Sequence, residues 1–231
     1  MNTNYTDITI LLDKSGSMAR DAEQTIEAVN AFIQTQKKGE GKCVLSLVQF
    51  ATKQEVTYIG HNIHSAPLLD RHSYRADGSS TALRDALYNT IKKTGERLAA
   101  MPESERPGYV LFVVQTDGLD NDSYQKHPLN VVVDSIEHQK NNYKWDFVFL
   151  GANMDAISSG AAFSFAPTSA LSYDKDNSRR TFQKMSDNVN NVRRLKSRLY
   201  ASGNVAEAQA TSYCVSEEDR KEAAGANTPT V

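Results

Sequence analysis

The chain has 231 residues, which corresponds to between one and two domains of ordinary size. It carries 26 Lys and Arg against 28 Asp and Glu, and its net charge of −2 lacks the basic surplus of a nucleic-acid-binding protein. Hydrophobic residues make up 39% of the chain, which is enough for a packed core. No apolar run approaches the roughly 18 residues of a membrane span. We therefore expect a folded domain that binds neither nucleic acid nor membranes.

The cysteines and the N-terminal residues bear on the cellular location. Cys43 and Cys214 lie far apart in the sequence and are too few for a disulfide framework. Residues 1–7 lack the basic flank and the apolar stretch of a secretory signal. Both features favour a cytoplasmic protein, and a mature chain whose signal has been removed remains the alternative.

Short β-branched runs alternate with segments of helical periodicity, which predict strands and helices respectively. The turn before residues 55–59 is too short for a helical crossover, so this strand is predicted to be an antiparallel edge. In chain order, the predicted elements are a strand at 8–12, a helix from 21 that ends before Gly39, strands at 44–50 and 55–59, a helix at 81–100, a strand at 109–114, a helix at 128–140, a strand at 147–150, a short helix at 155–162 and a strand at 163–166.

This alternation predicts an α/β fold. Several strands are apolar on both faces, which is typical of a mostly parallel, doubly wound, Rossmann-like sheet that helices flank on both sides. In such folds, ligands bind beyond the carboxyl ends of the strands. The residues that follow 8–12 and 109–114 are therefore the first candidates for a functional site.

The C-terminal part of the chain predicts one long amphipathic helix after Ser178, with apolar residues that include Phe182, Met185, Val189 and Val192. We expect this helix to pack on the domain, and a partner-binding helix is the alternative. The predicted organisation is a domain at 5–170, a helical extension at 171–201 and a flexible tail at 202–231, with a short helix at 205–210.

The first predicted strand ends in Asp13-Lys14-Ser15-Gly16-Ser17. Asp13, Ser15 and Ser17 place three oxygen-bearing side chains at alternate positions of one turn. Carboxylate and hydroxyl oxygens suit Mg²⁺ or Ca²⁺ rather than zinc or copper. Lys14 adds a positive charge, which either points outward to an acidic partner or points inward and weakens cation binding.

Two further segments strengthen the case for a metal site. Asp77-Gly78-Ser79-Ser80-Thr81-Ala82-Leu83 is a polar loop before a helix, and Thr116-Asp117-Gly118 follows a buried strand. Both segments should reach the same edge of the sheet as the first motif. We expect Asp120 and Asp122 to serve as turn and helix-capping residues, with support of the metal ligands as the alternative.

Together, these three motifs resemble the von Willebrand factor A domain with a complete metal-ion-dependent adhesion site. The resemblance covers about residues 5 to 166. It implies a Rossmann-like sheet with a divalent cation at its top, and by position the metal residues would be Asp13, Ser15, Ser17, Thr81 and Asp117. It also implies that the serines and the threonine touch the metal, that the aspartates often act through water, and that a carboxylate of the partner completes the coordination.

The resemblance implies a protein-interaction or adaptor module without catalysis. Its cation would be Mg²⁺, with Ca²⁺ or Mn²⁺ as alternatives, and its partner would be a protein that offers an Asp or Glu. A metal-dependent phosphoryl-transfer enzyme is one rival, but Ser15 stands where a dehalogenase-type phosphatase has its acid. A nucleotide-binding protein is disfavoured because the glycine-rich turn is missing after the first strand. A structural fold without metal function is the third alternative.

Overall fold

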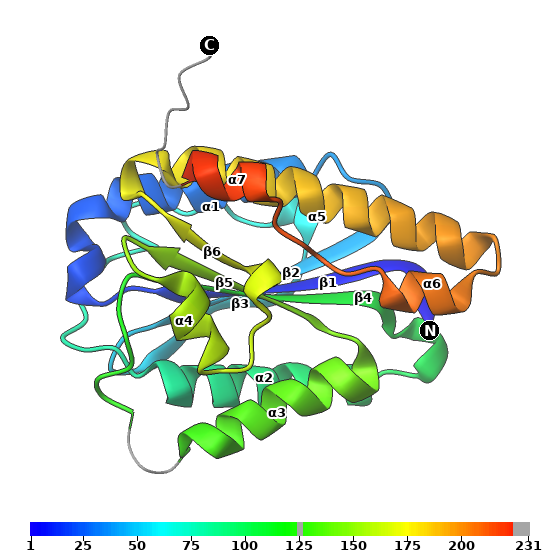
Figure 1. The fold of residues 1–231 in the computed structure, drawn as a ribbon, viewed down its shortest axis with the longest axis horizontal. Coiled ribbons are helices and arrows are strands. Elements are labelled where there is room, and N and C mark those ends of the chain that lie inside the picture. Colours follow the sequence, from blue (N-terminus) through cyan, green and yellow to red (C-terminus); the bar gives the residue numbers. More distant parts are fainter. Residues whose placement is uncertain (124–126, 224–231) are drawn as a thin grey trace.

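The computed structural model describes residues 1–123 and 127–223 and has a six-stranded sheet with the order β3-β2-β1-β4-β5-β6 (Figure 1). All neighbouring strands are parallel except β2 and β3, which pair antiparallel. The predicted fold class, including the antiparallel edge strand, is therefore confirmed. The strands are β1 (Asn2–Asp13), β2 (Lys42–Phe50), β3 (Gln54–Asn62), β4 (Pro107–Thr116), β5 (Asp146–Ala152) and β6 (Ala170–Tyr173).

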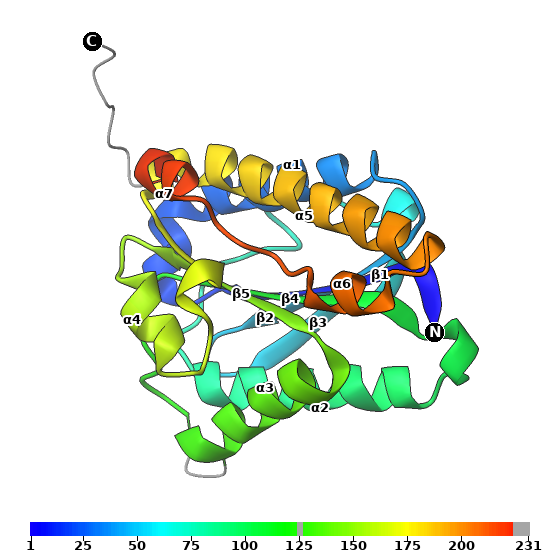
Figure 2. The same cartoon turned by 45° about the vertical axis from the view of Figure 1, so that its right-hand side comes forward.

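Helices form a layer on each side of the sheet (Figures 1 and 2). One layer contains α1 (Ala22–Gln36), α5 (Ser178–Ala201) and α7 (Glu217–Ala223), and the other contains α2 (Leu83–Ala99) and α3 (Leu129–Tyr143). Two short helices, α4 (Ala156–Ala161) and α6 (Val205–Ala210), lie near opposite ends of the sheet. In residues 1–123 and 127–223, no helix has the length and apolar character needed to cross a bilayer.

The core consists of two apolar layers because successive side chains of a strand point to opposite faces of the sheet. Ile8 and Ile10 of β1 pack towards α1 and α5, whereas Leu11 of the same strand packs with the residues of α2 and α3. All three side chains are fully buried. Such burial on both faces explains why the central strands read as continuous apolar runs in the sequence.

The prediction of a strand at 163–166 is wrong. The sixth strand lies at Ala170–Tyr173. The amides of Phe163 and Phe165 both donate to the carbonyl of Gly160, and Ser164 has a φ of 61°. These contacts turn the chain at the end of α4. Both phenylalanines are buried against the sheet, so their alternation with Ser164 imitates the pattern of a strand.

The segment predicted as a flexible tail contains α6 and α7 as far as residue 223, and residues 224–231 lie outside the described part of the chain. Tyr213 and Val215 are buried in the core layer of α1 and α5. The amide of Tyr213 donates to the buried carboxylate of Asp146 at 2.7 Å. Isolated anchors of this kind produce no periodic pattern, so the sequence alone suggested a loose tail.

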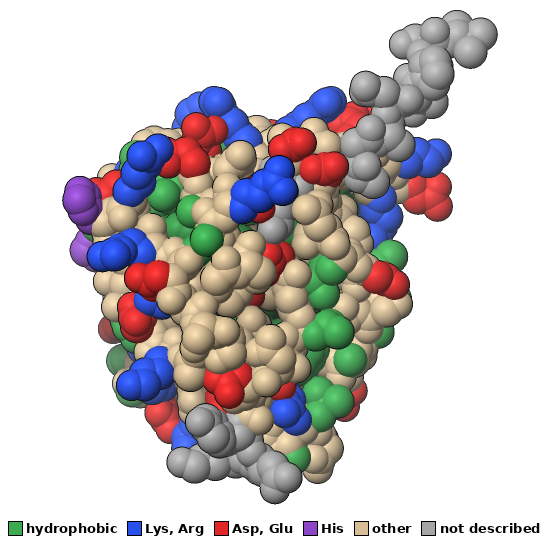
Figure 3. Space-filling view, turned by 90° about the vertical axis from the view of Figure 1, so that its left-hand side faces the viewer, with side chains coloured by type: hydrophobic (Ala, Val, Ile, Leu, Met, Phe, Trp, Pro, Cys, Tyr) green, Lys and Arg blue, Asp and Glu red, His purple; other side chains and the backbone are tan. Residues whose placement is uncertain are grey.

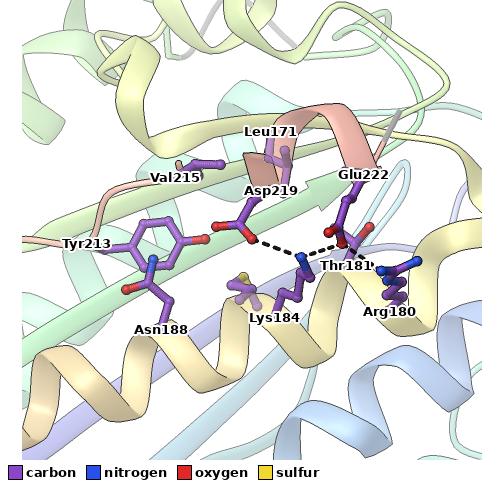
Figure 4. Close-up of a pocket in the computed structure, with 11 residues that line it drawn as sticks. Leu171, Arg180, Thr181, Lys184, Asn188, Tyr213, Val215, Asp219 and Glu222 are labelled. Atoms are coloured by element: carbon purple, nitrogen blue, oxygen red, sulfur yellow. Dashed lines mark hydrogen bonds and ion pairs between the residues drawn. The ribbon is translucent and has the colours of Figure 1, made fainter. Parts of the chain in front are cut away.

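Ion pairs hold α7 against α5 (Figure 4). Lys184 of α5 contacts Asp219 at 3.3 Å and also pairs with Glu222, which in turn lies 2.8 Å from Arg180. Figure 4 shows these side chains converging between the two helices. The contacts complete the packing of the C-terminal segment on the domain.

We predict that Tyr213→Ala lowers the free energy of unfolding by about 3 kcal/mol, because it removes a large buried side chain and leaves a cavity. Urea unfolding followed by circular dichroism measures this change. The matched control is Glu217→Ala, an exposed position of the same segment, which should change stability by less than about 0.5 kcal/mol. Equal stability of the two variants would show that the segment does not pack as described.

Candidate metal centre

The carboxylate of Asp13 lies at the end of β1 and is fully buried. Its Oδ1 accepts a hydrogen bond from the amide of Ser15 at 2.7 Å, and its Oδ2 accepts one from the hydroxyl of Thr116 at 2.6 Å. Because β1 and β4 are adjacent and parallel, Thr116 at the end of β4 reaches Asp13 directly. The carboxylate thus joins the turn after β1 to the loop after β4.

Burial raises the pKa of Asp13, and the hydrogen bonds from Thr116 and Ser15 oppose this shift. The nearby negative charge of Asp117 raises the pKa of Asp13 further. Burial and like charge both disfavour the ionised form of a carboxylate, whereas an adjacent cation favours it. Asp13 is therefore a buried carboxylate whose ionised form depends on the hydrogen bonds that it accepts.

The two serines connect Asp13 to Asp117. The hydroxyl oxygens of Ser15 and Ser17 lie 3.1 Å apart, and the Ser17 hydroxyl donates to Oδ1 of Asp117 at 2.6 Å. Ser15 is buried, whereas Ser17 is exposed and Asp117 is half-buried. A continuous path of contacts thus runs from the buried Asp13 to the surface.

The loop that carries Thr81 pairs with the turn after β1. The amide of Gly16 donates to the carbonyl of Gly78 at 2.6 Å, and the amide of Gly78 donates to the carbonyl of Lys14 at 3.2 Å. A Cβ atom at Gly78 would lie only 2.1 Å from the Cβ of Ala51, so this close approach requires glycine. Ser79 and Ser80 follow Gly78 in the chain and take no part in this backbone pairing.

Thr81 is buried and is held through its backbone. Its amide donates to the side-chain oxygen of Asn121 at 2.7 Å, and its carbonyl accepts from the amides of Asn121 and Asp122 at 3.0 and 3.2 Å. The Thr81 hydroxyl lies 3.9 Å from the position of a Cβ atom at Gly118, the residue after Asp117. The structure therefore brings the residues predicted from the sequence to one edge: Asp13, Ser15, Ser17, Thr81 and Asp117.

Asp120 and Asp122 organise the loops around this centre. Asp120 accepts hydrogen bonds from the amide and the Nε of Arg84 at 3.1 and 2.7 Å, which fixes the first turn of α2. Asp122 accepts from the Ser80 hydroxyl at 2.5 Å. Asp120 therefore holds a backbone amide in the first turn of α2, as expected of a capping residue, whereas the contact of Asp122 lies within the loop before α2.

Lys14 is directed towards the edge strand. Its ammonium group lies 2.8 Å from the carboxylate of Glu55 on β3. This ion pair balances the positive charge of Lys14 with an acidic side chain of the neighbouring strand.

The sequence motifs did not assign roles to Thr116, Asn121 or Tyr74. Thr116 orients Asp13, Asn121 positions Thr81, and the Tyr74 hydroxyl donates to the backbone carbonyl of Asp13 at 2.7 Å. Thr116 directly precedes Asp117 at the end of a strand, and this position could have indicated its role beside the site. Asn121 and Tyr74 lie in loops whose conformation no local pattern predicts.

The donors at this edge are oxygen atoms, and hydroxyls outnumber carboxylates among the predicted ligands. Within residues 1–123 and 127–223, no group of three or more His, Cys, Asp or Glu side chains is arranged to hold a metal ion. Any ion at this centre would therefore depend on the serine and threonine hydroxyls. Figure 3 shows this end of the molecule, where backbone and uncharged polar side chains dominate the middle of the surface and acidic side chains lie among them.

A sequence profile of the von Willebrand factor type A domain matches residues 7–144. The match spans more than half of the chain, which therefore belongs to the von Willebrand factor type A family. Domains of this family are commonly protein-interaction modules and are generally not enzymes. A search of curated proteins found no match.

Several solved structures share the fold. The chain resembles proximal thread matrix protein 1 from the mussel byssus, solved with a zinc-occupied metal-ion-dependent adhesion site, at 13% identity and a TM-score of 0.56, with 80% of this chain and 47% of that one covered. The von Willebrand factor type A protein from Catenulispora acidiphila matches at 16% identity and a TM-score of 0.53, with 80% and 42% covered. The pilus adhesin SpaC from Lactobacillus rhamnosus GG matches at 12% identity and a TM-score of 0.61, with 82% and 30% covered. This chain spans less than half of each, and the likeness shows the fold alone.

We predict that Thr116→Val lowers the free energy of unfolding by about 1–3 kcal/mol when measured in EDTA, because the buried Asp13 loses a hydrogen-bond donor. The control is Thr9→Val on β1, whose hydroxyl is buried without a hydrogen-bond partner among the described residues. Chemical denaturation compares the two variants. If Thr116→Val is no less stable than Thr9→Val, the hydroxyl of Thr116 does not support Asp13.

Proposed function

We propose that this protein is a metal-dependent protein-interaction module of the adaptor type. In this proposal, Asp13, Ser15, Ser17, Thr81 and Asp117 hold a divalent cation, and a partner protein binds through an Asp or Glu side chain. Mg²⁺ is the proposed ion, with Ca²⁺ and Mn²⁺ as alternatives. The observation that carries the proposal is the short contact path from Ser15 through Ser17 to Asp117.

The spacing of the hydroxyls supports the proposed ion. Mg²⁺ binds oxygen ligands at about 2.0–2.1 Å in octahedral geometry, so neighbouring ligands lie about 2.9 Å apart. The 3.1 Å between the hydroxyls of Ser15 and Ser17 is close to this separation. Both oxygens of Asp13 already accept hydrogen bonds from Ser15 and Thr116. In this proposal the hydroxyls touch the ion and the aspartates act through water, so the ion keeps an attraction for a carboxylate of the partner.

The exposure of the residues supports recognition of a partner. Asp13 and Ser15 are buried, whereas Ser17 is exposed. The proposed ion would therefore be held by the protein from below and could be reached by a partner from the surface. When bound, the cation supplies a positive site for a charge-assisted bond to a carboxylate. Ser17 and Asp117 then define the direction from which the partner approaches.

We propose no catalytic role for this centre. A phosphoryl-transfer enzyme of the dehalogenase type needs an acid two residues after Asp13, and Ser15 occupies that place. Lys14, the neighbouring cation, is paired with Glu55. The arrangement of hydroxyls and carboxylates therefore fits the holding of an ion better than proton transfer.

We also propose a cytoplasmic location. Cys43 is buried and Cys214 is exposed, and neither forms a disulfide. Burial raises the pKa of the Cys43 thiol to about 11, so it stays protonated and inert at neutral pH. Free thiols of this kind fit a reducing compartment.

We predict that Mg²⁺ raises the melting temperature of the protein by about 5–10 °C relative to EDTA. An ion at about 100 times its Kd stabilises the folded state by about 2.7 kcal/mol, and each kcal/mol corresponds to about 2–4 °C for a domain of this size. Thr81→Val keeps the volume of the side chain and removes its hydroxyl, so it should reduce this shift to less than about half.

The matched control for the melting experiment is Thr94→Val, a buried threonine of α2. Position 94 lies about 20 Å along the helix direction from position 81, so the Mg²⁺ shift should equal that of the wild type. The proposal fails if Mg²⁺ has no effect on the wild type, or if both variants keep the full shift.

We predict that capture of a protein partner requires the metal. Affinity purification followed by mass spectrometry should identify a protein that is retained in Mg²⁺ and lost in EDTA. The same protein should be lost with Thr81→Val and retained with Thr94→Val. Replacing the partner's contacting Asp or Glu by the corresponding amide should also abolish capture, whereas capture that is equally efficient in EDTA would contradict the proposal.

A further inference from the structure

A groove with a volume of about 620 Å³ opens at the end of the sheet opposite to the candidate metal centre. The metal centre lies beyond the carboxyl ends of β1 and β4, whereas the groove is lined by Pro107 and Val110 at the start of β4 and by Trp145 just before β5. Figure 2 brings this end of the molecule forward, next to the N-terminus. The two sites are therefore spatially separate.

One face of α2 and one face of α3 form the long walls of the groove. Tyr88, Lys92 and Ala99 lie along α2, and Ser135 and Asn142 lie along α3. Residues three or four positions apart share one face of a helix, so these side chains form two facing stripes.

Gly95 keeps the space between the two stripes open. It lies on the α2 wall of the groove. A Cβ atom at this position would have only the side-chain amide of Gln139 within reach, at 3.4 Å. A larger side chain would therefore project into the groove.

Aromatic side chains line the groove from several elements: Tyr88 of α2, His138 and Tyr143 of α3, Trp145 before β5 and Tyr200 of α5. The rings of His138 and Tyr143 lie edge to face, with their centroids 5.6 Å apart. Tyr143 is 58% exposed, which is high for a large aromatic side chain. Aromatic rings bury a large area against a flat ligand and stack on it in preferred geometries. The aromatic lining is therefore suited to a planar aromatic group.

The charge of the groove is opposite in sign to that of the chain. Its basic side chains are Lys92, Arg106, Lys144 and Lys196, and its acidic side chains are Glu96 and Glu103, in a chain whose net charge is −2. Arg106 and Lys196 donate to backbone carbonyls. Lys92 has no ion-pair partner among residues 1–123 and 127–223, so its ammonium group is available to an anion.

We propose that this groove binds a small aromatic anion, a planar ring that carries a carboxylate, sulfonate or phosphate group. The ring lies against the aromatic side chains of α3, His138 and Tyr143, and Lys92 of α2 contacts the acidic group. The volume falls within the range of about 300–1,000 Å³ that is typical of small-molecule sites. Binding is independent of the metal centre because the two sites lie at opposite ends of the sheet.

The test uses anilinonaphthalene sulfonate, a fluorescent aromatic anion, as the probe. Trp145 is the only tryptophan of the chain and lines the groove, so excitation of Trp145 should transfer energy to the bound dye. We expect saturable binding of one dye per chain with the same affinity in Mg²⁺ and in EDTA. Lys92→Glu should weaken binding about fivefold, in keeping with the loss of an exposed ion pair.

Two further variants separate the proposal from an effect on folding. Gly95→Leu fills the groove and should weaken dye binding at least about tenfold, while leucine favours the helix more than glycine does. Lys93→Glu changes an exposed neighbour that does not line the groove, and it should leave the affinity unchanged within about twofold. The proposal is overturned if the dye does not saturate, if Lys92→Glu and Gly95→Leu bind it like the wild type, or if EDTA abolishes binding.

Discussion

The hydrogen bonds of the buried Asp13 carboxylate hold the carboxyl edge of the sheet together. Its two oxygens accept from Ser15 and Thr116, which belong to different loops. The parallel register places Leu12 opposite Gln115, so the next residues, Asp13 and Thr116, meet without a change in the path of the chain. The turn that presents Ser15 and Ser17 depends on this pairing, because a buried carboxylate without donors would be unfavourable.

The remaining loops are held by polar contacts instead of an apolar core. Gly16 and Gly78 join the first two loops through their backbones, and Asn121 joins the third loop to Thr81. Such contacts fix the positions of the buried Ser15 and Thr81 and leave Ser17 exposed at the surface. The opposite end of the molecule differs, since aromatic and basic side chains there surround an open groove. The two ends of the sheet thus carry surfaces of different chemistry.

The sequence predicted the sheet and the polar turn after β1 because their signals are local. Buried strands are continuous apolar runs, and Asp13, Ser15 and Ser17 occur within one turn. The prediction of a strand at 163–166 was wrong because Phe163 and Phe165 alternate with polar Ser164 as residues of a strand do, although they belong to the turn that ends α4. The packing of Tyr213 against the domain depends on Asp146, which lies 67 residues away in the sequence. Contacts of this kind arise from the tertiary structure and leave no periodic trace.

The central claim is that scattered hydroxyls and carboxylates form one cation site. Anomalous diffraction from crystals soaked in Mn²⁺ tests it most directly, because the ion itself is located. We predict one strong peak at about 2.0–2.3 Å from the hydroxyl oxygens of Ser15, Ser17 and Thr81. A fully soaked crystal with no peak at this edge, or with a peak that contacts none of these hydroxyls, would contradict the account.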